Sequence, residues 1–292
     1  MSTFLQQIIN GISIGSVYAL IAVGYSLVYS ILKFSNFAHG SVLMLGSYFG
    51  FFALTLFKVP FWLALPLAII GAGILAIINE RLAYRPIRMR NAPLLYLMIS
   101  SLGASIFLEN LTIVTIGPTF RTYPEVFPIA PFMLGDLSIG RLDVIILIIA
   151  AVSMALLTWI IYGTRIGNAI RATSYNMRVA SLMGINPDLV VGLVFFLAGA
   201  SAGLGGVLFG IKYTVWPQMG ILTLKAFIAA VVGGLGSLPG AVLGAVILGV
   251  TETFAAAFVS SAFRDLFSYA LMIVIILIRP GGLLGTITEE KA

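Results

Sequence analysis

Nine apolar stretches follow one another along this chain of 292 residues, and they limit its fold more than any other feature. A helix that crosses a bilayer needs about 20 mostly apolar residues. Only 9% of the residues are charged, against about 25% in a soluble domain, so a single polytopic all-α membrane domain over 1–292 is expected. The stretches are 8–32, 38–57, 60–80, 93–116, 143–162, 189–211, 224–236, 240–259 and 265–279.

The seventh stretch is too short to cross a bilayer on its own. It runs into Gly-Gly-Leu-Gly-Ser-Leu-Pro-Gly at 233–240, and both glycine and proline interrupt a helix. We therefore expect eight full spans and one broken, partial span.

Basic residues indicate which ends of the spans face the cytoplasm. Segment 81–92 carries four arginines and segment 163–187 carries three. When the spans alternate, both segments share a face with Lys33, Arg279 and Lys291, and we assign that face to the cytoplasm. The N-terminus and the proline-rich loop 117–142 then lie outside. The net charge of +6 is explained by this topology and needs no nucleic-acid partner.

Two weak repeats concern the packing of the spans. Leu-Lys-Phe at 32–34 precedes Gly-Ser at 46–47, as Leu-Lys-Ala at 224–226 precedes Gly-Ser at 236–237. The similarity fits either an inverted repeat of four plus four helices joined by span 143–162 or a chance match. Glycines four residues apart also recur, which favours close helix packing. These pairs are Gly11/Gly15, Gly46/Gly50, Gly199/Gly203, Gly206/Gly210 and Gly240/Gly244.

Several kinds of chemistry are excluded by what the sequence lacks. The chain has no cysteine and one histidine, so it contains neither a thiolate nucleophile nor a His-pair metal site. No phosphate-binding Gly-x-x-x-x-Gly-Lys-Ser/Thr motif occurs, so we expect no ATP hydrolysis by this chain. Glu109 and Glu252 lie in apolar stretches without a recognisable hydrolytic motif. We expect neither an enzyme nor a bound cofactor or metal.

Segment 163–187 is too polar to span a membrane and is long enough for a short helix. Gly184 and Pro187 are expected to end that helix. At helical spacing, Arg171 shares a face with Tyr175, Arg178 and Leu182. Two interpretations remain open: a helix lying at the lipid headgroups, or a docking site for a cytoplasmic partner.

Five motifs make the chain similar to permease subunits of branched-chain amino acid ABC transporters of the high-affinity importer type. The resemblance runs from about Asn10 to Gly285. The motifs are NGISIGSVYAL at 10–20, NFAHG at 36–40 with MLGSY at 44–48, RA at 171–172 with ASLMGIN at 180–186, VVGGLGS at 231–237, and RPGGL at 279–283.

This resemblance implies a half-channel in the bacterial inner membrane that a second permease, the same or homologous, completes. Two cytoplasmic ATP-binding subunits would dock on loop 163–187, and an external solute-binding protein would deliver the substrate. The importer pattern Glu-Ala-Ala-x-x-x-Gly overlays 178–184, where only Ala180 and Gly184 match. The implied coupling residues are Arg165, Arg171, Tyr175, Arg178, Ala180, Leu182, Gly184 and Ile185.

The resemblance also implies a class of substrates. Branched-chain amino acids are expected, and urea or short amides, which family members also transport, are the alternative. A self-sufficient secondary transporter is the alternative from another class.

Broken helices at 33–40 and 233–240 would present backbone N–H and C=O groups to a zwitterionic substrate. His39 has an equally weighted alternative as a residue that hydrogen-bonds a neighbouring helix. Lys225 and Arg264 are interpreted as anchors that reach towards the lipid headgroups. The expected path residues are Asn36, His39, Gly40, Gly233, Gly234, Gly236, Asn110, Thr251 and Glu252.

Overall fold

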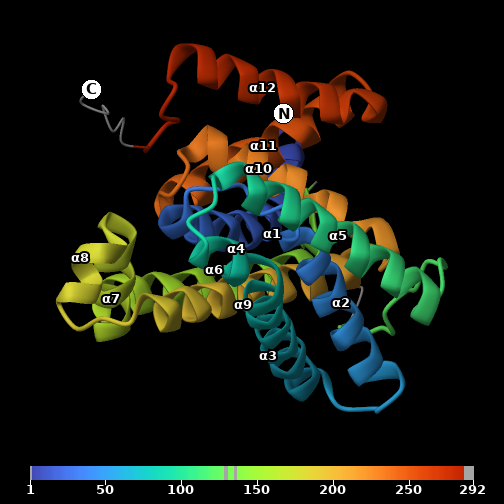
Figure 1. Ribbon diagram of the computed structural model, residues 1–292. Helices are drawn as coiled ribbons and strands as arrows, with labels where there is room; N and C mark the ends of the chain where they lie inside the picture. Colours follow the sequence, from blue (N-terminus) through green and yellow to red (C-terminus); the bar gives the residue numbers. More distant parts are fainter. Residues whose placement is uncertain (1, 128–130, 135–136, 286–292) are drawn as a thin grey trace.

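The structure, a computed structural model, describes residues 2–127, 131–134 and 137–285, and most of this part of the chain is α-helical (Figure 1). Pro128 of the proline-rich loop and Lys291 lie outside the described residues. The α-helices are α1 (Ser2–Leu32), α2 (His39–Thr55), α3 (Phe61–Asn79), α4 (Arg85–Met89), α5 (Leu94–Ile116), α6 (Arg141–Gly163), α7 (Arg165–Tyr175), α8 (Met177–Leu182), α9 (Pro187–Lys212), α10 (Leu222–Gly233), α11 (Leu238–Phe258) and α12 (Arg264–Ile278). The shorter elements are the π-helical turn η1 (Glu80–Tyr84), the 3-10 helices η2 (Pro217–Ile221) and η3 (Ser261–Phe263), and the antiparallel strands β1 (Phe132–Leu134) and β2 (Leu137–Ile139).

Seven helical segments in the described residues are long and apolar enough to cross a membrane. They are α1, α3 continued through η1 and α4, α5, α6, α9, α11, and α12 together with η3. Two apolar helices are shorter, since α2 has 17 residues and α10 has 12. The polytopic all-α fold is confirmed. The structure differs from the prediction in stretch 38–57. This stretch forms the short helix α2 rather than an eighth full span, because the first turn of α2 is already buried inside the bundle.

Helix α1 runs through the middle of the molecule, and the other long helices surround it (Figure 1). Nearly all of its side chains from Gly11 to Leu32 are buried. Its glycines allow a close approach to α11: a Cβ on Gly11 would lie 2.6 Å from the Val250 Cα atom. Each of the five predicted glycine pairs lies where another segment approaches the backbone in this way. Lipid supplies no hydrophobic drive between helices, so these close contacts hold the bundle together.

The helices before and after α6 pack as two related sets. Helix α1 packs against α11 as α9 packs against α3, and α10 packs against α1 as α2 packs against α9. The two sets run in opposite directions, because α9 ends beside the first half of α1, where Lys212 donates to the Ser13 hydroxyl at 2.8 Å. This packing is that of the inverted repeat of four plus four helices. The short sequence echo does not mark equivalent positions, since Lys33 lies between α1 and α2 and Lys225 lies inside α10.

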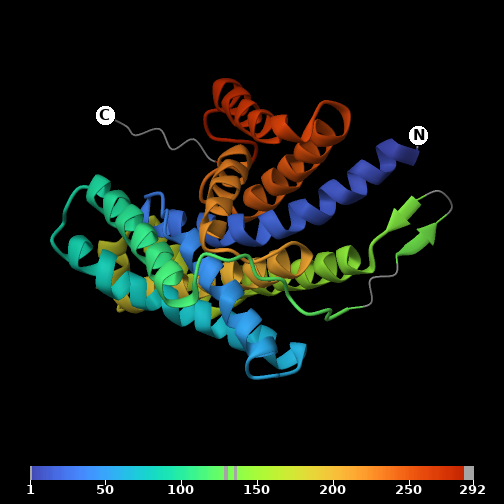
Figure 2. The ribbon, with the colours of Figure 1, turned by 90° about the vertical axis from the view of Figure 1, so that its right-hand side faces the viewer.

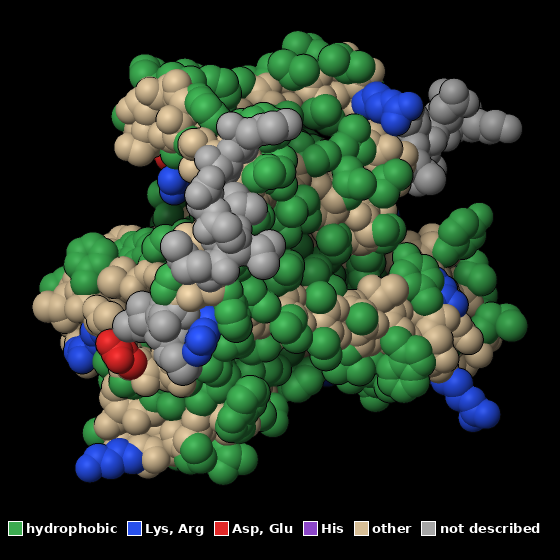
Figure 3. All heavy atoms as spheres, turned by 180° about the vertical axis from the view of Figure 1, so that it is seen from behind, with side chains coloured by type: hydrophobic (Ala, Val, Ile, Leu, Met, Phe, Trp, Pro, Cys, Tyr) green, Lys and Arg blue, Asp and Glu red, His purple; other side chains and the backbone are tan. Residues whose placement is uncertain are grey.

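The bundle has two chemically different ends, seen at the left and right of Figure 2. The basic end comprises the link 33–38 and segments 80–93, 163–187 and 279–285. The hairpin end comprises the start of α1, the described part of loop 117–140, and turns 56–60, 213–221 and 259–263. Between the ends, apolar side chains cover much of the face in Figure 3, and Lys and Arg side chains lie towards its margins. This distribution is that of a multi-pass membrane protein.

Loop 117–142 covers the ends of α2 and α3, as an irregular cap up to residue 127. The Tyr123 hydroxyl donates to the Ser47 carbonyl at 2.6 Å. Burial raises the pKa of Tyr123, so its hydroxyl stays protonated and remains a donor. The rings of Phe127 and Phe61 pack edge to face with centroids 4.9 Å apart. The sequence did not predict the hairpin β1–β2 that follows, nor that α6 begins at Arg141.

Candidate functional site

Segment 163–187 forms two short helices, α7 and α8, rather than the single helix expected. The backbone of Asn176 between them is extended. Its side chain accepts hydrogen bonds from the N–H groups of Arg178 and Val179 at 3.0 and 3.1 Å, which is an N-cap for α8. The expected face running from Arg171 to Leu182 assumed one continuous helix, and the break at Asn176 divides it.

The end of α8 follows the prediction. Gly184 has φ of +84°, the left-handed conformation that ends many helices, and Pro187 occupies the first turn of α9. A side chain at position 184 would meet no neighbouring atom within 4 Å. The segment therefore turns sharply at Gly184 on an open surface.

Helices α7 and α8 expose large apolar side chains at the basic end. Tyr175, Leu182 and Met183 are 93%, 81% and 78% exposed. Arg165 and Arg178 are also exposed, and no carboxylate lies within ion-pair distance of them in the part of the chain that the structure describes. Two other predicted coupling residues face inward, since Ala180 is buried and Ile185 is half-buried.

Arg171 fastens α7 to the end of α6. Its guanidinium donates to the Ile161 carbonyl oxygen and to Asn168 Oδ1, the latter at 2.6 Å, and lies over the Tyr162 ring at 5.4 Å from the centroid. Gly167 allows α7 to touch the same carbonyl end of α6. Arg171 therefore makes contacts within the chain that hold the segment in place.

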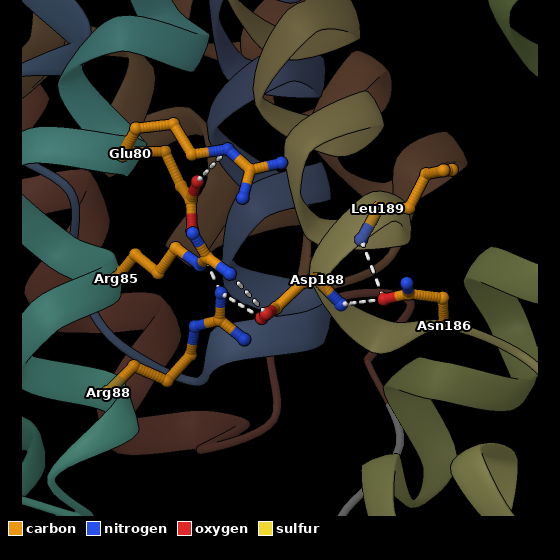
Figure 4. A network of polar contacts seen from close by, with 7 residues as sticks. Glu80, Arg85, Arg88, Asn186, Asp188 and Leu189 are labelled. Atoms are coloured by element: carbon orange, nitrogen blue, oxygen red, sulfur yellow. Dashed lines mark hydrogen bonds and ion pairs between the residues drawn. The ribbon is translucent and has the colours of Figure 1, made fainter.

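An ionic cluster joins segment 80–88 to the start of α9, directly after the two short helices (Figure 4). Arg88 pairs with both Glu80 and Asp188 at 2.9 Å, and Arg85 pairs with Asp188 at 3.0 Å. Glu80 is fully buried in η1, and Asn186 caps α9 through two backbone N–H groups. The sequence interpretation missed this cluster because it used these arginines only as topology signals. A carboxylate at the end of an apolar stretch was the available signal, since a buried charge requires a partner.

His39 and Gly40 lie where the short helices α2 and α10 begin next to each other inside the bundle. A Cβ on Gly40 would overlap the Gly220 carbonyl oxygen and the Thr223 hydroxyl. His39 Nε2 lies 3.1 Å from the Ile21 carbonyl oxygen of α1, and a carbonyl only accepts, so this nitrogen carries a proton. The Thr223 hydroxyl is buried without a hydrogen-bond partner among the described residues. We call this place the α2–α10 junction.

Asn36 is held by its own surroundings. Its Oδ1 atom accepts hydrogen bonds from the Ala38 N–H at 3.2 Å and from the Tyr84 hydroxyl at 2.9 Å. The Tyr84 hydroxyl accepts in turn from Asn79 at 3.0 Å. Ser101 of α5 also accepts from the backbone of the link. These bonds fix the link 33–38 that leads into the junction.

The turn 233–237 between α10 and α11 is covered by the segment that follows α12. Gly234 and Gly236 have φ values of +113° and +87°, which favour glycine. Leu283 and Leu284 donate backbone hydrogen bonds to the carbonyls of residues 232 and 233 at 2.9 and 2.8 Å. The Ser26 hydroxyl of α1 accepts from the Gly236 N–H at 2.9 Å. The predicted break in the helix is confirmed, and its backbone is bonded within the chain.

Glu252 is the buried member of an ionic group that joins four helices. Lys225 of α10 pairs with Glu252 at 2.6 Å and with Asp265 at 2.5 Å. The hydroxyls of Tyr18 and Ser268 donate to Glu252 at 3.0 and 2.7 Å. The interpretation of Lys225 as a lipid-facing anchor is wrong, because its ammonium lies in these ion pairs.

The remaining predicted path residues are dispersed. Asn110 lies on an exposed face of α5, where its side chain donates to the Ile106 carbonyl at 2.8 Å. Thr251 donates to the Ile247 carbonyl of its own helix at 2.8 Å. The structure thus brings together His39 and Gly40 at the junction and the three glycines in the turn 233–237, and it places the other candidates at separate positions. No group of three or more His, Asp or Glu side chains suitable for a metal ion occurs within residues 2–127, 131–134 and 137–285.

Comparisons with known proteins agree with this architecture. The family model of the permease component of branched-chain amino acid transport systems matches residues 7–276. The chain is 41% identical to the high-affinity branched-chain amino acid transport system permease protein LivH of Salmonella typhimurium, over 99% of this chain and 97% of that protein. It is 39% identical to the corresponding protein BraD of Pseudomonas aeruginosa, over 99% and 98%. The fold is similar to that of an inward-facing transporter of the metal-chelate ABC type, with a TM-score of 0.53 and 16% identity over 94% of this chain and 86% of that one.

Proposed function

Since this chain belongs to the family of permease components of branched-chain amino acid transport systems, we propose that it forms half of an ATP-driven importer for branched-chain amino acids. A second permease, the same or homologous, completes the path in the bacterial inner membrane. Two cytoplasmic ATP-binding subunits supply the energy, and an external solute-binding protein delivers the solute. The names of LivH and BraD support this substrate class, because both relatives are similar over nearly their whole length.

The exposed surface of α7 and α8 carries the proposal that separate subunits dock on this chain. Tyr175, Leu182 and Met183 present apolar area there, and Arg165 and Arg178 add charge at its margin. Apolar side chains surrounded by cations suit a protein partner that offers a groove rimmed by carboxylates. The basic end is then the cytoplasmic side, in agreement with the positive-inside rule.

The two short helices and the ionic cluster supply a route for motion. A partner that moves α7 pulls on α6 through the contacts of Arg171 and Gly167. It also moves the start of α9, which Asp188 ties to Arg85 and Arg88. Closure of the ATP-binding subunits thus shifts the helices on both sides of the segment, which is a rigid-body mode of switching.

We place the solute path at the α2–α10 junction, with His39, Gly40 and Thr223 along it. Helix α2 begins there and directs the positive end of its dipole to the interior, and η2 leads into α10 beside it. The unpartnered Thr223 hydroxyl supports a position that polar solute or water reaches. Asn36 and the turn 233–237 then hold the backbone around the path.

The test is assembly and transport with variants of the docking surface. We expect Gly184→Glu and Arg178→Glu to abolish co-purification of the ATP-binding subunits and ATP-dependent uptake of L-leucine into proteoliposomes, with the chain still inserted. Gly184→Glu adds strain and a carboxylate at a residue with positive φ, and Arg178→Glu reverses the charge at the rim. The matched control is Lys58→Glu, an exposed charge reversal at the hairpin end, which leaves both measurements unchanged.

Two outcomes contradict the proposal. If the ATP-binding subunits co-purify with both variants as they do with the wild type, the proposed docking surface is wrong. Uptake of leucine by the purified chain alone, driven by an ion gradient, would show that the chain is a self-sufficient transporter and not an importer subunit.

A further inference from the structure

A cavity of about 380 Å³ lies at the hairpin end, opposite the docking surface. Its size is within the usual range of about 300–1,000 Å³ for small-molecule sites. Five segments contribute to its wall: Asn10 comes from α1, Asp143 from α6, Lys212 from α9, Ala257 from α11 and Arg264 from α12. The sequence gives no hint of this cavity, because its lining residues, from Gln7 to Arg264, are up to 257 positions apart.

The polar groups of this cavity are only partly paired with one another. Asp143 Oδ1 lies 2.6 Å from Lys212 Nζ and accepts from the Ser13 hydroxyl at 2.6 Å. The second oxygen, Asp143 Oδ2, has no hydrogen-bond partner among the described residues. Arg264 has no carboxylate within ion-pair distance in the same part of the chain, and its Nε atom is buried without a hydrogen-bond partner.

The charges of the lining define what fits there. Two cations, Lys212 and Arg264, face one carboxylate, Asp143, so the wall carries an excess positive charge and lacks one anion. Asp143 Oδ2 and Asn10 Oδ1, which already accepts from Gln6 Nε2 at 3.2 Å, can each accept a hydrogen bond from a cation on the same ligand. Ala256 and Ala257 form a small apolar part of the wall. A ligand with one carboxylate, one ammonium and an apolar side chain matches all three features.

We infer that this cavity binds the free α-amino acid on its way into the transporter, with its carboxylate at Arg264 and its ammonium at Asp143. The inference rests on the proposed function, and it adds an entry site on the outer side, distinct from the α2–α10 junction. A guanidinium suits this role because it binds carboxylate with two parallel hydrogen bonds. The apolar side chain of the ligand lies against Ala256 and Ala257.

The experiment measures equilibrium binding of radiolabelled L-leucine to the assembled transporter in nanodiscs without the external binding protein. We expect saturable binding to the wild type. 3-Methylbutylamine, which lacks the carboxylate, and 4-methylpentanoate, which lacks the ammonium, each compete at least about tenfold less well, because charged hydrogen bonds are lost. Arg264→Gln weakens leucine binding by about tenfold or more and leaves the affinity for 3-methylbutylamine unchanged.

The control is Arg141→Gln, the same substitution at an arginine of the hairpin end that packs on the Phe132 ring and does not line the cavity. It is expected to keep the wild-type affinity for leucine. Ala257→Leu is a second variant, which keeps all charges. It tests the entry site if the Arg264→Gln transporter does not assemble. It fills the apolar part of the wall, so leucine binding falls while L-alanine binding is retained.

Absence of saturable leucine binding in the wild type, or unchanged affinity in both cavity variants, overturns the entry site. The proposed function is judged separately, by ATP-dependent leucine uptake of the wild-type transporter with its external binding protein. If the wild type takes up leucine but does not bind it at the cavity, the proposed importer function stands and the entry site is wrong. If the wild type does not take up leucine, the proposed importer function is wrong.

Discussion

At the scale of single residues, the two buried carboxylates among the described residues each pair with a basic side chain. Glu80 is fully buried and pairs with Arg88, and Glu252 is 1% exposed and pairs with Lys225. A buried carboxylate without a cation is strongly destabilising, so these two residues require the partners that face them. Glu252 also accepts from Tyr18 and thereby connects α11 to the central helix.

The pair Lys225–Glu252 gives a prediction of stability. Lys225→Met leaves the Glu252 carboxylate buried without its cation and is expected to lower the free energy of unfolding by about 3–5 kcal/mol. The double variant Lys225→Met/Glu252→Gln removes the uncompensated charge and is expected to recover most of that loss. Unfolding of the purified chain in detergent measures both, with the exposed Lys58→Met as control at about ±0.5 kcal/mol. A double variant no more stable than Lys225→Met contradicts the pairing.

At the scale of elements, small residues decide how closely the helices approach. Helix α9 meets α2 and α3 along Gly199, Gly203 and Gly206, where any side chain would touch a neighbouring helix. Asn176 and Asn186 cap α8 and α9, and they divide the polar segment into rigid pieces. These caps and the packing of α7 on α6 fix the positions of the two short helices that form the proposed docking surface.

A pair of glycine variants tests this close packing. A Cβ at Gly203 would lie 2.5 Å from the Ala72 Cβ atom, so Gly203→Ala is expected to cost about 1–3 kcal/mol through overpacking. Gly103 of α5 has no neighbour within 4 Å, so Gly103→Ala is expected to stabilise its helix by about 1 kcal/mol. Thermal unfolding of the isolated chain compares the two. Equal effects of both substitutions contradict specific packing of α9.

At the scale of the whole molecule, the charge distribution sets the orientation in the membrane. The basic end contains Lys33, the arginines of segments 80–93 and 163–187, and Arg279, and the hairpin end contains the cavity of mixed charge. Cytoplasmic loops collect Lys and Arg, so we expect the proposed docking surface to face the cytoplasm and the cavity to face the outside. The α2–α10 junction joins one short helix from each half of the inverted repeat, which is where such repeats form their binding sites.

The absence of cysteine from the chain makes this orientation directly measurable. Thr119→Cys, in the exposed loop of the hairpin end, is expected to react with a membrane-impermeant maleimide on intact cells. Tyr175→Cys, 93% exposed at the basic end, is expected to react only after the membrane is permeabilised, in cells that produce this chain without the ATP-binding subunits that would cover it. The unmodified chain is the control without label. If Tyr175→Cys reacts on intact cells, the basic end lies outside. The assigned orientation and the docking of cytoplasmic subunits are then both contradicted.

The sequence alone determined the positions of the helices and several of their ends. A bilayer excludes unpaired backbone, so the long apolar runs were expected to be helical, and the glycines at 233–236 followed by Pro239 predicted an interruption. It also separated segment 163–187 from the spans, because that segment is too polar for lipid. It did not predict that α2 is short, that Asn176 divides the polar segment, or that a hairpin precedes α6.

Only the tertiary structure decided which helix is central and which charges meet. In lipid, inward and outward faces are equally apolar, so composition does not reveal that α1 is enclosed or that α3 packs on α9. Arg88 meets Asp188 and Lys225 meets Glu252 because the bundle brings distant helices together, and pairs of this kind leave no local pattern. The α2–α10 junction and the cavity near Arg264 also depend on how distant helices pack against one another. Periodicity along the chain does not reveal this packing.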